Sequence, residues 1–212
     1  PYTFLLTAVI FAVSSIPTFV KVKELSPVVP IPEGETLLSV SFKQLVATFR
    51  DIRSYKEFLR YMVAFLIYND GIMMLMDFAA IIGGTLFGLG QVQLIIFVII
   101  LHITGALGAL FFGRISDQRS SKRAIIFSLL ILIVSLLFLY LVDGMVGFFV
   151  VGAFAGFSLS GAQAVSRTMV SQLAPESKTT EFYGFLSVAG RTSTFVGPLV
   201  FGASSYNAYT FY

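Results

Sequence analysis

Six long apolar stretches limit what this chain can fold into. They run from Tyr2 to Val20, Phe58 to Ile82, Val92 to Phe112, Ala124 to Val142, Met145 to Val165 and Phe182 to Gly202. A helix needs about 20 mostly apolar residues to cross a hydrocarbon core of roughly 30 Å. No stretch alternates apolar with polar residues, as a membrane barrel strand does. The sequence therefore predicts an all-α, polytopic membrane helix bundle with six transmembrane helices.

The distribution of charge supports this prediction and gives it a direction. Charged residues make up 12% of the chain, against about 25% in soluble domains. Thirteen of the 14 Lys and Arg residues lie between or beside spans on one side: Lys21, Lys23, Lys43, Arg50, Arg53, Lys56, Arg60, Arg114, Arg119, Lys122, Arg123, Arg167 and Lys178. The connections 83–91 and 143–144 have none. By the positive-inside rule the basic side is cytoplasmic, so the net charge of +3 indicates contact with a lipid bilayer and not with nucleic acid.

Three parts are expected along the chain: a first helix at 1–20, a cytoplasmic linker at 21–57 and a helical bundle at 58–212. The linker opens with the Pro-rich segment Ser26 to Pro32. Its second part, Glu35 to Glu57, has apolar residues three and four apart, which predicts an amphipathic helix at the membrane interface; a plain cytosolic tether is the alternative. Because the chain opens at Pro1 and enters an apolar run at once, we expect it to be an internal fragment of a larger protein.

A charged motif separates the third and fourth spans. It contains Gly113, Arg114, Asp117, Arg119, Lys122 and Arg123. The segment Gly113 to Arg123 resembles the motif that joins the second and third helices of each half of major facilitator transporters. That resemblance implies a gating loop. In it, we expect Gly113 to allow close approach of a neighbouring helix and Asp117 to accept hydrogen bonds at a helix N-terminus or to pair with a cation. A generic basic loop is the alternative.

Three further segments narrow the resemblance. Phe65 to Gly71, Ser160 to Arg167, and Glu181 to Phe185 followed by Gly197 to Gly202 are similar to the branch that includes fungal vacuolar amino-acid effluxers. This implies a partial major facilitator fold, with six of an expected twelve transmembrane helices and the N-terminal half-bundle as the missing partner. In that fold, 1–20 is expected to be the last transmembrane helix of the N-terminal half, and 58–212 the C-terminal half-bundle without its final helix. It also implies a transporter without enzymatic activity or cofactor, located in the vacuolar membrane if fungal or in the plasma membrane if prokaryotic.

Polar residues at membrane depth indicate a pathway for a small-molecule substrate and a coupled proton. They are Asn69, Asp70, Asp77, His102, Gln163 and Arg191, and a charge at such depth costs at least about 2.5–3.5 kcal/mol. We expect Asp70 to bind a proton or an ammonium group and Arg191 to hold a carboxylate or pair with Asp70. Arg167 is expected at a cytoplasmic gate. Purely structural hydrogen bonds or ion pairs are the alternative for each. The first and fourth spans lack such residues and are predicted to face lipid.

The function predicted is secondary-active transport of a small solute, with amino acids as the candidate class. In this branch, however, Arg191 often corresponds to a lysine. Two other functions were weighed: a sensor or scaffold derived from a transporter, and an intramembrane enzyme that uses Asp70 and His102. The chain contains no HExxH, no GxSxG and no metal-ligand spacing, so no catalytic or metal-binding residues are predicted.

Overall fold

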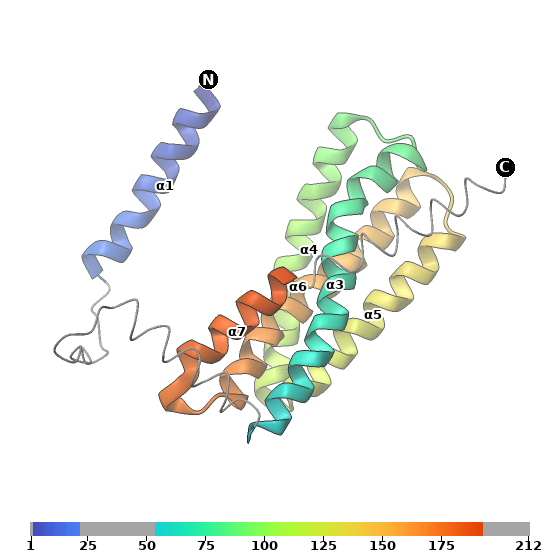
Figure 1. Cartoon of the computed structure of the whole chain (residues 1–212). Coiled ribbons are helices and arrows are strands. Elements are labelled where there is room, and N and C mark those ends of the chain that lie inside the picture. The colour runs from blue at the N-terminus through green and yellow to red at the C-terminus, as the bar shows by residue number, and fades with distance from the viewer. Residues whose placement is uncertain (1, 22–53, 193–212) are drawn as a thin grey trace. The chain divides into compact units, whose positions relative to one another are not determined.

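The computed structural model describes residues 2–21 and 54–192 (Figure 1). The described elements are α1 (Tyr2–Lys21), α3 (Lys56–Thr85), α4 (Gln91–Gln118), α5 (Ser121–Leu141), α6 (Gly144–Leu173), η2 (Glu176–Lys178) and α7 (Thr179–Thr192). Five of them, α1 and α3 to α6, are long and apolar enough to cross a membrane. The prediction of an all-α, polytopic bundle is therefore confirmed. The amphipathic helix expected at 35–57 and the end of the sixth span lie largely outside the described residues.

The chain divides into two units, and α1 belongs to the first while α3 to α7 form the second. In the second unit, the breaks between helices follow local backbone chemistry. Gly88 and Gly144 adopt positive φ angles of 63° and 80° at the turns before α4 and α6, a conformation that glycine adopts without steric cost. At the far end of α6, Ala174 precedes Pro175 and has an extended ψ of 136°, since a residue before proline avoids the helical region.

The pair α4 and α6 forms the most extensive helix contact of the bundle, and glycines make it possible. A Cβ atom added at Gly108 would overlap the backbone of Phe157, and one added at Gly156 would lie 2.9 Å from the carbonyl oxygen of Leu101. Gly105 allows the same closeness to Ser160. The two helices run in the same direction, and the contact residues on each are three or four positions apart. The contacts therefore recur about once per turn and bring the two backbones together.

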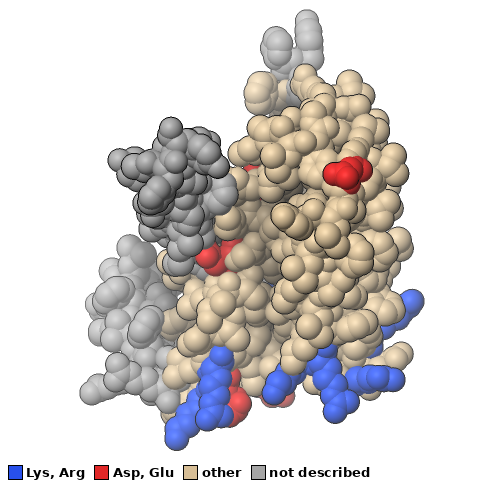
Figure 2. All heavy atoms as spheres, turned by 90° about the vertical axis from the view of Figure 1, so that its right-hand side faces the viewer, with Lys and Arg blue, Asp and Glu red and all other residues tan. Residues whose placement is uncertain are grey.

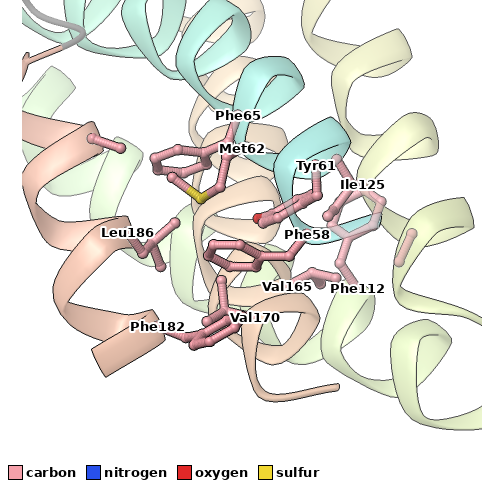
Figure 3. Close-up of a cluster of buried hydrophobic side chains, with 12 residues drawn as sticks. Phe58, Tyr61, Met62, Phe65, Phe112, Ile125, Val165, Val170, Phe182 and Leu186 are labelled. Carbon is pink, nitrogen blue, oxygen red and sulfur yellow. The ribbon is translucent and has the colours of Figure 1, made fainter. Parts of the chain in front are cut away.

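Buried aromatic side chains join α3, α6 and α7 (Figure 3). The rings of Phe58 and Phe182 have centroids 4.3 Å apart, and both side chains are almost fully buried. On α7 the buried residues Phe182, Leu186 and Ala189 are spaced by four and three, which places them on one helical face. This face fixes α7 against the start of α3 and the end of α6.

The fourth predicted span, α5, is lipid-facing on one side only. Ser121, Ser128 and Ser135 are buried at intervals of seven residues, so they share a face, and α5 packs on α6 and α4. Large apolar residues such as Leu137 and Phe138 are exposed on the remaining surface. The prediction that this span faces lipid therefore stays a prediction, and it can apply only to the exposed side of α5.

One end of the bundle carries the basic residues, and we call it the basic end. There α3 and α5 begin and α4 and α6 end. Figure 2 shows the Lys and Arg side chains of one face gathered at this end, with none further along the visible bundle. The segregation seen in the sequence is thus a property of the folded unit.

Candidate functional site

A cavity of about 300 Å³ lies between α3, α4, α5 and α6, toward the end of the bundle opposite the basic end. Its wall is mostly apolar, with Phe97 and Phe148 among the larger side chains. The α3 residues Leu75, Ala79 and Ile82 line it, and their spacing of four and three puts them on one face of that helix. Such a size and lining are typical of a small-molecule site.

Two of the residues predicted for the pathway meet at this cavity. His102 from α4 and Gln163 from α6 both line it, together with Ser160. The Nδ1 atom of His102 lies 2.8 Å from the carbonyl oxygen of Val98, and the amide nitrogen of Gln163 donates to the sulfur of Met76 at 3.7 Å. The structure therefore gives an apolar cavity a small group of polar atoms supplied by α4 and α6.

The other predicted pathway residues do not line this cavity. Asn69 is buried and its Nδ2 donates to the carbonyl oxygen of Gly190 at 3.2 Å. This bond joins the residue before Asp70 to the residue before Arg191. Asp70 is half-buried, whereas Asp77 and Arg191 are exposed. Of the six residues, His102 and Gln163 thus line the cavity and Asn69 bonds α3 to α7, whereas Asp70, Asp77 and Arg191 do not line the cavity.

The charged motif lies mostly on helices, and this corrects the expectation of a loop. Helix α4 continues to Gln118 and α5 begins at Ser121, so Arg119 and Ser120 alone connect them. Asp117 lies in the last turn of α4, and Lys122 and Arg123 lie in the first turn of α5. Each of these charges opposes the dipole of its own helix.

Two detailed expectations for the motif are wrong. A Cβ atom at Gly113 would meet nothing within 4 Å, so the close helix approach is made at Gly105 and Gly108 instead. Asp117 is exposed and sits at a helix C-terminus, and its carboxylate forms no ion pair within the described ranges 2–21 and 54–192. Arg114, Arg119, Lys122 and Arg123 are also exposed.

A hydrogen-bonded tyrosine–serine cluster, Tyr61, Tyr68 and Ser166, joins α3 to α6. Tyr61 Oη donates to the backbone oxygen of Ser166 at 3.0 Å, and Tyr68 Oη lies 2.7 Å from Ser166 Oγ. Ser166 Oγ in turn donates to the carbonyl of Ala162, so Tyr68 is the donor toward Ser166. Sequence reasoning missed this cluster, although the spacing of seven between the tyrosines placed both on one helical face.

A second missed network holds the charged motif to α6. Ser116 Oγ lies 2.7 Å from Ser121 Oγ, which donates to Gln172 Oε1 at 2.7 Å. Ser116 and Ser121 are buried, and they come from the two helices that the motif connects. Nearby, Tyr183 of α7 donates to the backbone oxygen of Arg167 at 3.0 Å, and the Arg167 side chain is exposed. The inner side of the motif is therefore fixed by neutral hydrogen bonds.

Comparison with known proteins places this arrangement in a family. An uncharacterized MFS-type transporter, YxiO, of Bacillus subtilis (strain 168) is 24% identical over 165 residues, which cover 78% of this chain and 38% of the relative. Autophagy-related protein 22 of Yarrowia lipolytica is 25% identical over 182 residues, which cover 80% of this chain and 30% of that protein. Autophagy-related protein 22 of Kluyveromyces lactis is 26% identical over 181 residues, which cover 78% of this chain and 36% of that protein.

The chain spans about a third of the length of these curated relatives. No solved structure matches it. The model of the family described as vacuole effluxer Atg22 like matches residues 1–206. Because that match covers nearly the whole chain, the protein belongs to the vacuole effluxer Atg22-like family of integral membrane proteins.

Proposed function

We propose that the chain is part of a secondary-active transporter that moves a small solute, with amino acids as the first class to test. The observation that carries this proposal is the cavity at membrane depth, where His102 and Gln163 supply polar groups within an otherwise apolar wall. Secondary transporters that work by alternating access bind their substrates near the bilayer midplane, where two halves of the fold meet. Two comparisons support the proposal of transport. One relative is described as an MFS-type transporter, and the matching family is described as vacuole effluxer Atg22 like.

The charged motif is assigned a gating role in this proposal. Asp117, Lys122 and Arg123 oppose the dipoles of their helices, an arrangement that costs stability unless another group compensates it in some state of the transport cycle. The exposed side chain of Arg167 lies at the same basic end and is assigned to the same gate. Asp70 and Arg191 are kept as pathway residues beside the bond between Asn69 and Gly190.

The flux test fills the cavity. Ala155 lines it, whereas Ala106 on α4 is exposed and does not. A phenylalanine ring at position 155 would occupy space that a solute needs, so Ala155→Phe should weaken solute binding about tenfold or more. Full-length protein in liposomes, assayed with a mixture of radiolabelled amino acids under a proton gradient, should lose most uptake with Ala155→Phe and keep it with Ala106→Phe. Equal uptake by both variants would remove the cavity from the pathway.

The basic end is proposed to face the cytoplasm, or the cytosol if the membrane is vacuolar, by the positive-inside rule. The chain contains no cysteine, so single cysteines at Gln118 and Asp143 can report the orientation. Both positions are exposed, at opposite ends of α5. The test uses a cysteine-free full-length protein and a membrane-impermeant thiol reagent. Added outside intact cells, the reagent reaches the non-cytoplasmic side and should label Asp143→Cys alone. Added outside vacuolar vesicles that keep the lumen inside, it reaches the cytosolic side and should label Gln118→Cys alone. Labelling of Gln118→Cys from the non-cytoplasmic side would contradict the proposed orientation.

A further inference from the structure

The hydrogen bond of His102 determines which ring nitrogen remains available. Nδ1 lies 2.8 Å from the carbonyl oxygen of Val98, one turn earlier on α4. A carbonyl oxygen can only accept a hydrogen bond, so Nδ1 carries the hydrogen. In the neutral ring, Nε2 then carries a lone pair and can accept a hydrogen bond or a proton. The side chain is exposed and lines the cavity.

Two neutral polar groups from α6 line the same cavity as this ring. Ser160 and Gln163 are three residues apart on α6 and therefore lie on one face. The Ser160 hydroxyl makes no hydrogen bond within the part of the chain that the structure describes, and it packs beside Gly105 on α4. Gln163 uses its amide nitrogen on the weak acceptor sulfur of Met76. Each of these groups can donate a hydrogen bond to a bound oxygen atom.

Among the described residues that line the cavity, His102 is the one with an ionisable side chain. Asp77 follows the lining residue Met76 on α3 but does not line the cavity, and Asp70 lies two turns nearer the basic end. Arg114 and Asp117 on α4, Lys122 and Arg123 on α5 and Arg167 on α6 all lie toward the basic end. Asp143, between α5 and α6 at the opposite end, is exposed and does not line the cavity. Within the described residues, a protonated His102 would therefore have no lining carboxylate as its counter-ion.

This imbalance couples charge binding to proton binding. A carboxylate entering alone, or a proton binding to His102 alone, would leave an uncompensated charge in a largely apolar cavity. Both together form a neutral pair joined by a charge-assisted hydrogen bond. We propose that the cavity binds a small monocarboxylate with an apolar body and that His102 takes up one proton with each carboxylate bound. The proton comes from a buffer acid or a hydronium ion in the solvent, whose conjugate base stays in solution, and it forms the Nε2–H bond; no bond in the solute breaks.

The inference rests on the proposed function for the identity of the solute site, but binding can be measured without flux. The probes are 4-methylpentanoate and its neutral amide, 4-methylpentanamide. Isothermal titration calorimetry on the detergent-solubilised full-length protein, in buffers of different ionisation enthalpy, gives the number of protons taken up. We expect about one proton per carboxylate and none per amide, and carboxylate affinity should fall as pH rises, by up to about tenfold per pH unit.

Two variants test the assignment to His102. His102→Gln should abolish proton uptake and weaken carboxylate binding about tenfold or more, because a hydrogen bond to a charged group is lost. Binding of the amide should change little. Ser160→Ala should keep the proton uptake, since it removes a neutral group alone. Carboxylate binding without proton uptake, uptake that persists in His102→Gln, or no carboxylate binding at pH 6 would each overturn the inference.

These outcomes separate the inference from transport itself. If the protein carries other solutes but the carboxylate fails, the inference is wrong and the proposed function stands. If the carboxylate binds with a proton and no solute of any class is carried, the proposed function is wrong and the inference stands.

Discussion

Helices α3 and α6 contribute to both the tyrosine–serine cluster and the cavity, and these two regions differ in whether their polar groups have hydrogen-bond partners. In the tyrosine–serine cluster, each hydroxyl of Tyr61, Tyr68 and Ser166 has a partner within the cluster or on the α6 backbone. At the cavity, Ser160 and His102 Nε2 have none within the described residues. A paired buried group holds helices together, whereas an unpaired group is available to a solute. The comparison separates the fixed part of the bundle from its binding part.

The largest expected effect belongs to the fixed part. A Cβ atom at Gly108 would overlap the backbone of Phe157, while one at Gly113 would meet nothing. Gly108→Ala should therefore destabilise the full-length protein by about 1–3 kcal/mol. Gly113→Ala should be neutral or stabilising by up to about 1 kcal/mol, since alanine favours a helix. Thermal unfolding in detergent measures both, and a stable Gly108→Ala variant would show that α4 and α6 need no such closeness.

An intermediate effect is expected at the tyrosine–serine cluster. Tyr68→Phe removes the donor to Ser166 Oγ and should cost about 0.5–1.5 kcal/mol of unfolding free energy. Tyr140→Phe is the matched control, because Tyr140 is 92% exposed. A double-mutant cycle with Ser166→Ala should show coupling between the two side chains. Additive effects would mean that the bond does not hold α3 to α6.

The smallest expected effect on stability is at the cavity. Ser160→Ala removes a hydroxyl without a partner and should change the unfolding free energy by less than about 0.5 kcal/mol. Ser166→Ala, at a buried serine with several partners, should cost more. Unfolding of the two variants under identical conditions sharpens the comparison, and an equal loss in both would remove the distinction between fixed and binding regions.

The helices themselves were predictable because membrane length and apolar composition leave few alternatives. The ends of the helices were harder to predict. Helix α4 continues through Gly113 to Gln118, because charged side chains at the end of a bundle do not prevent the backbone from being helical. The close helix approach was expected at Gly113, whereas Gly105 and Gly108 make it. Sequence spacing shows which glycines share a face but not which of them meets a neighbouring backbone.

The candidate site was predictable as a set of residues and not as an arrangement. Depth in the membrane selected six polar residues without showing which of them lie together, and only His102 and Gln163 of these line the cavity. It did not show that Asn69 bonds to Gly190 instead, since this depends on how α7 packs on α3. Tyr61 and Tyr68 gave no such signal, because a neutral tyrosine hydroxyl costs far less at membrane depth than a charge, although their hydroxyls carry the cluster.

The glycine contacts between α4 and α6 also limit how the bundle can move. Packed helices shift by sliding over a layer of interlocking side chains. At Gly105, Gly108 and Gly156 that layer is absent, and backbone atoms of one helix meet atoms of the other. The two helices are therefore expected to move together as a single lever, and relative displacement is left to α3 and α7, whose contacts are made through side chains. A cavity bounded by α3 on one side and by this lever on the other changes width whenever α3 tilts.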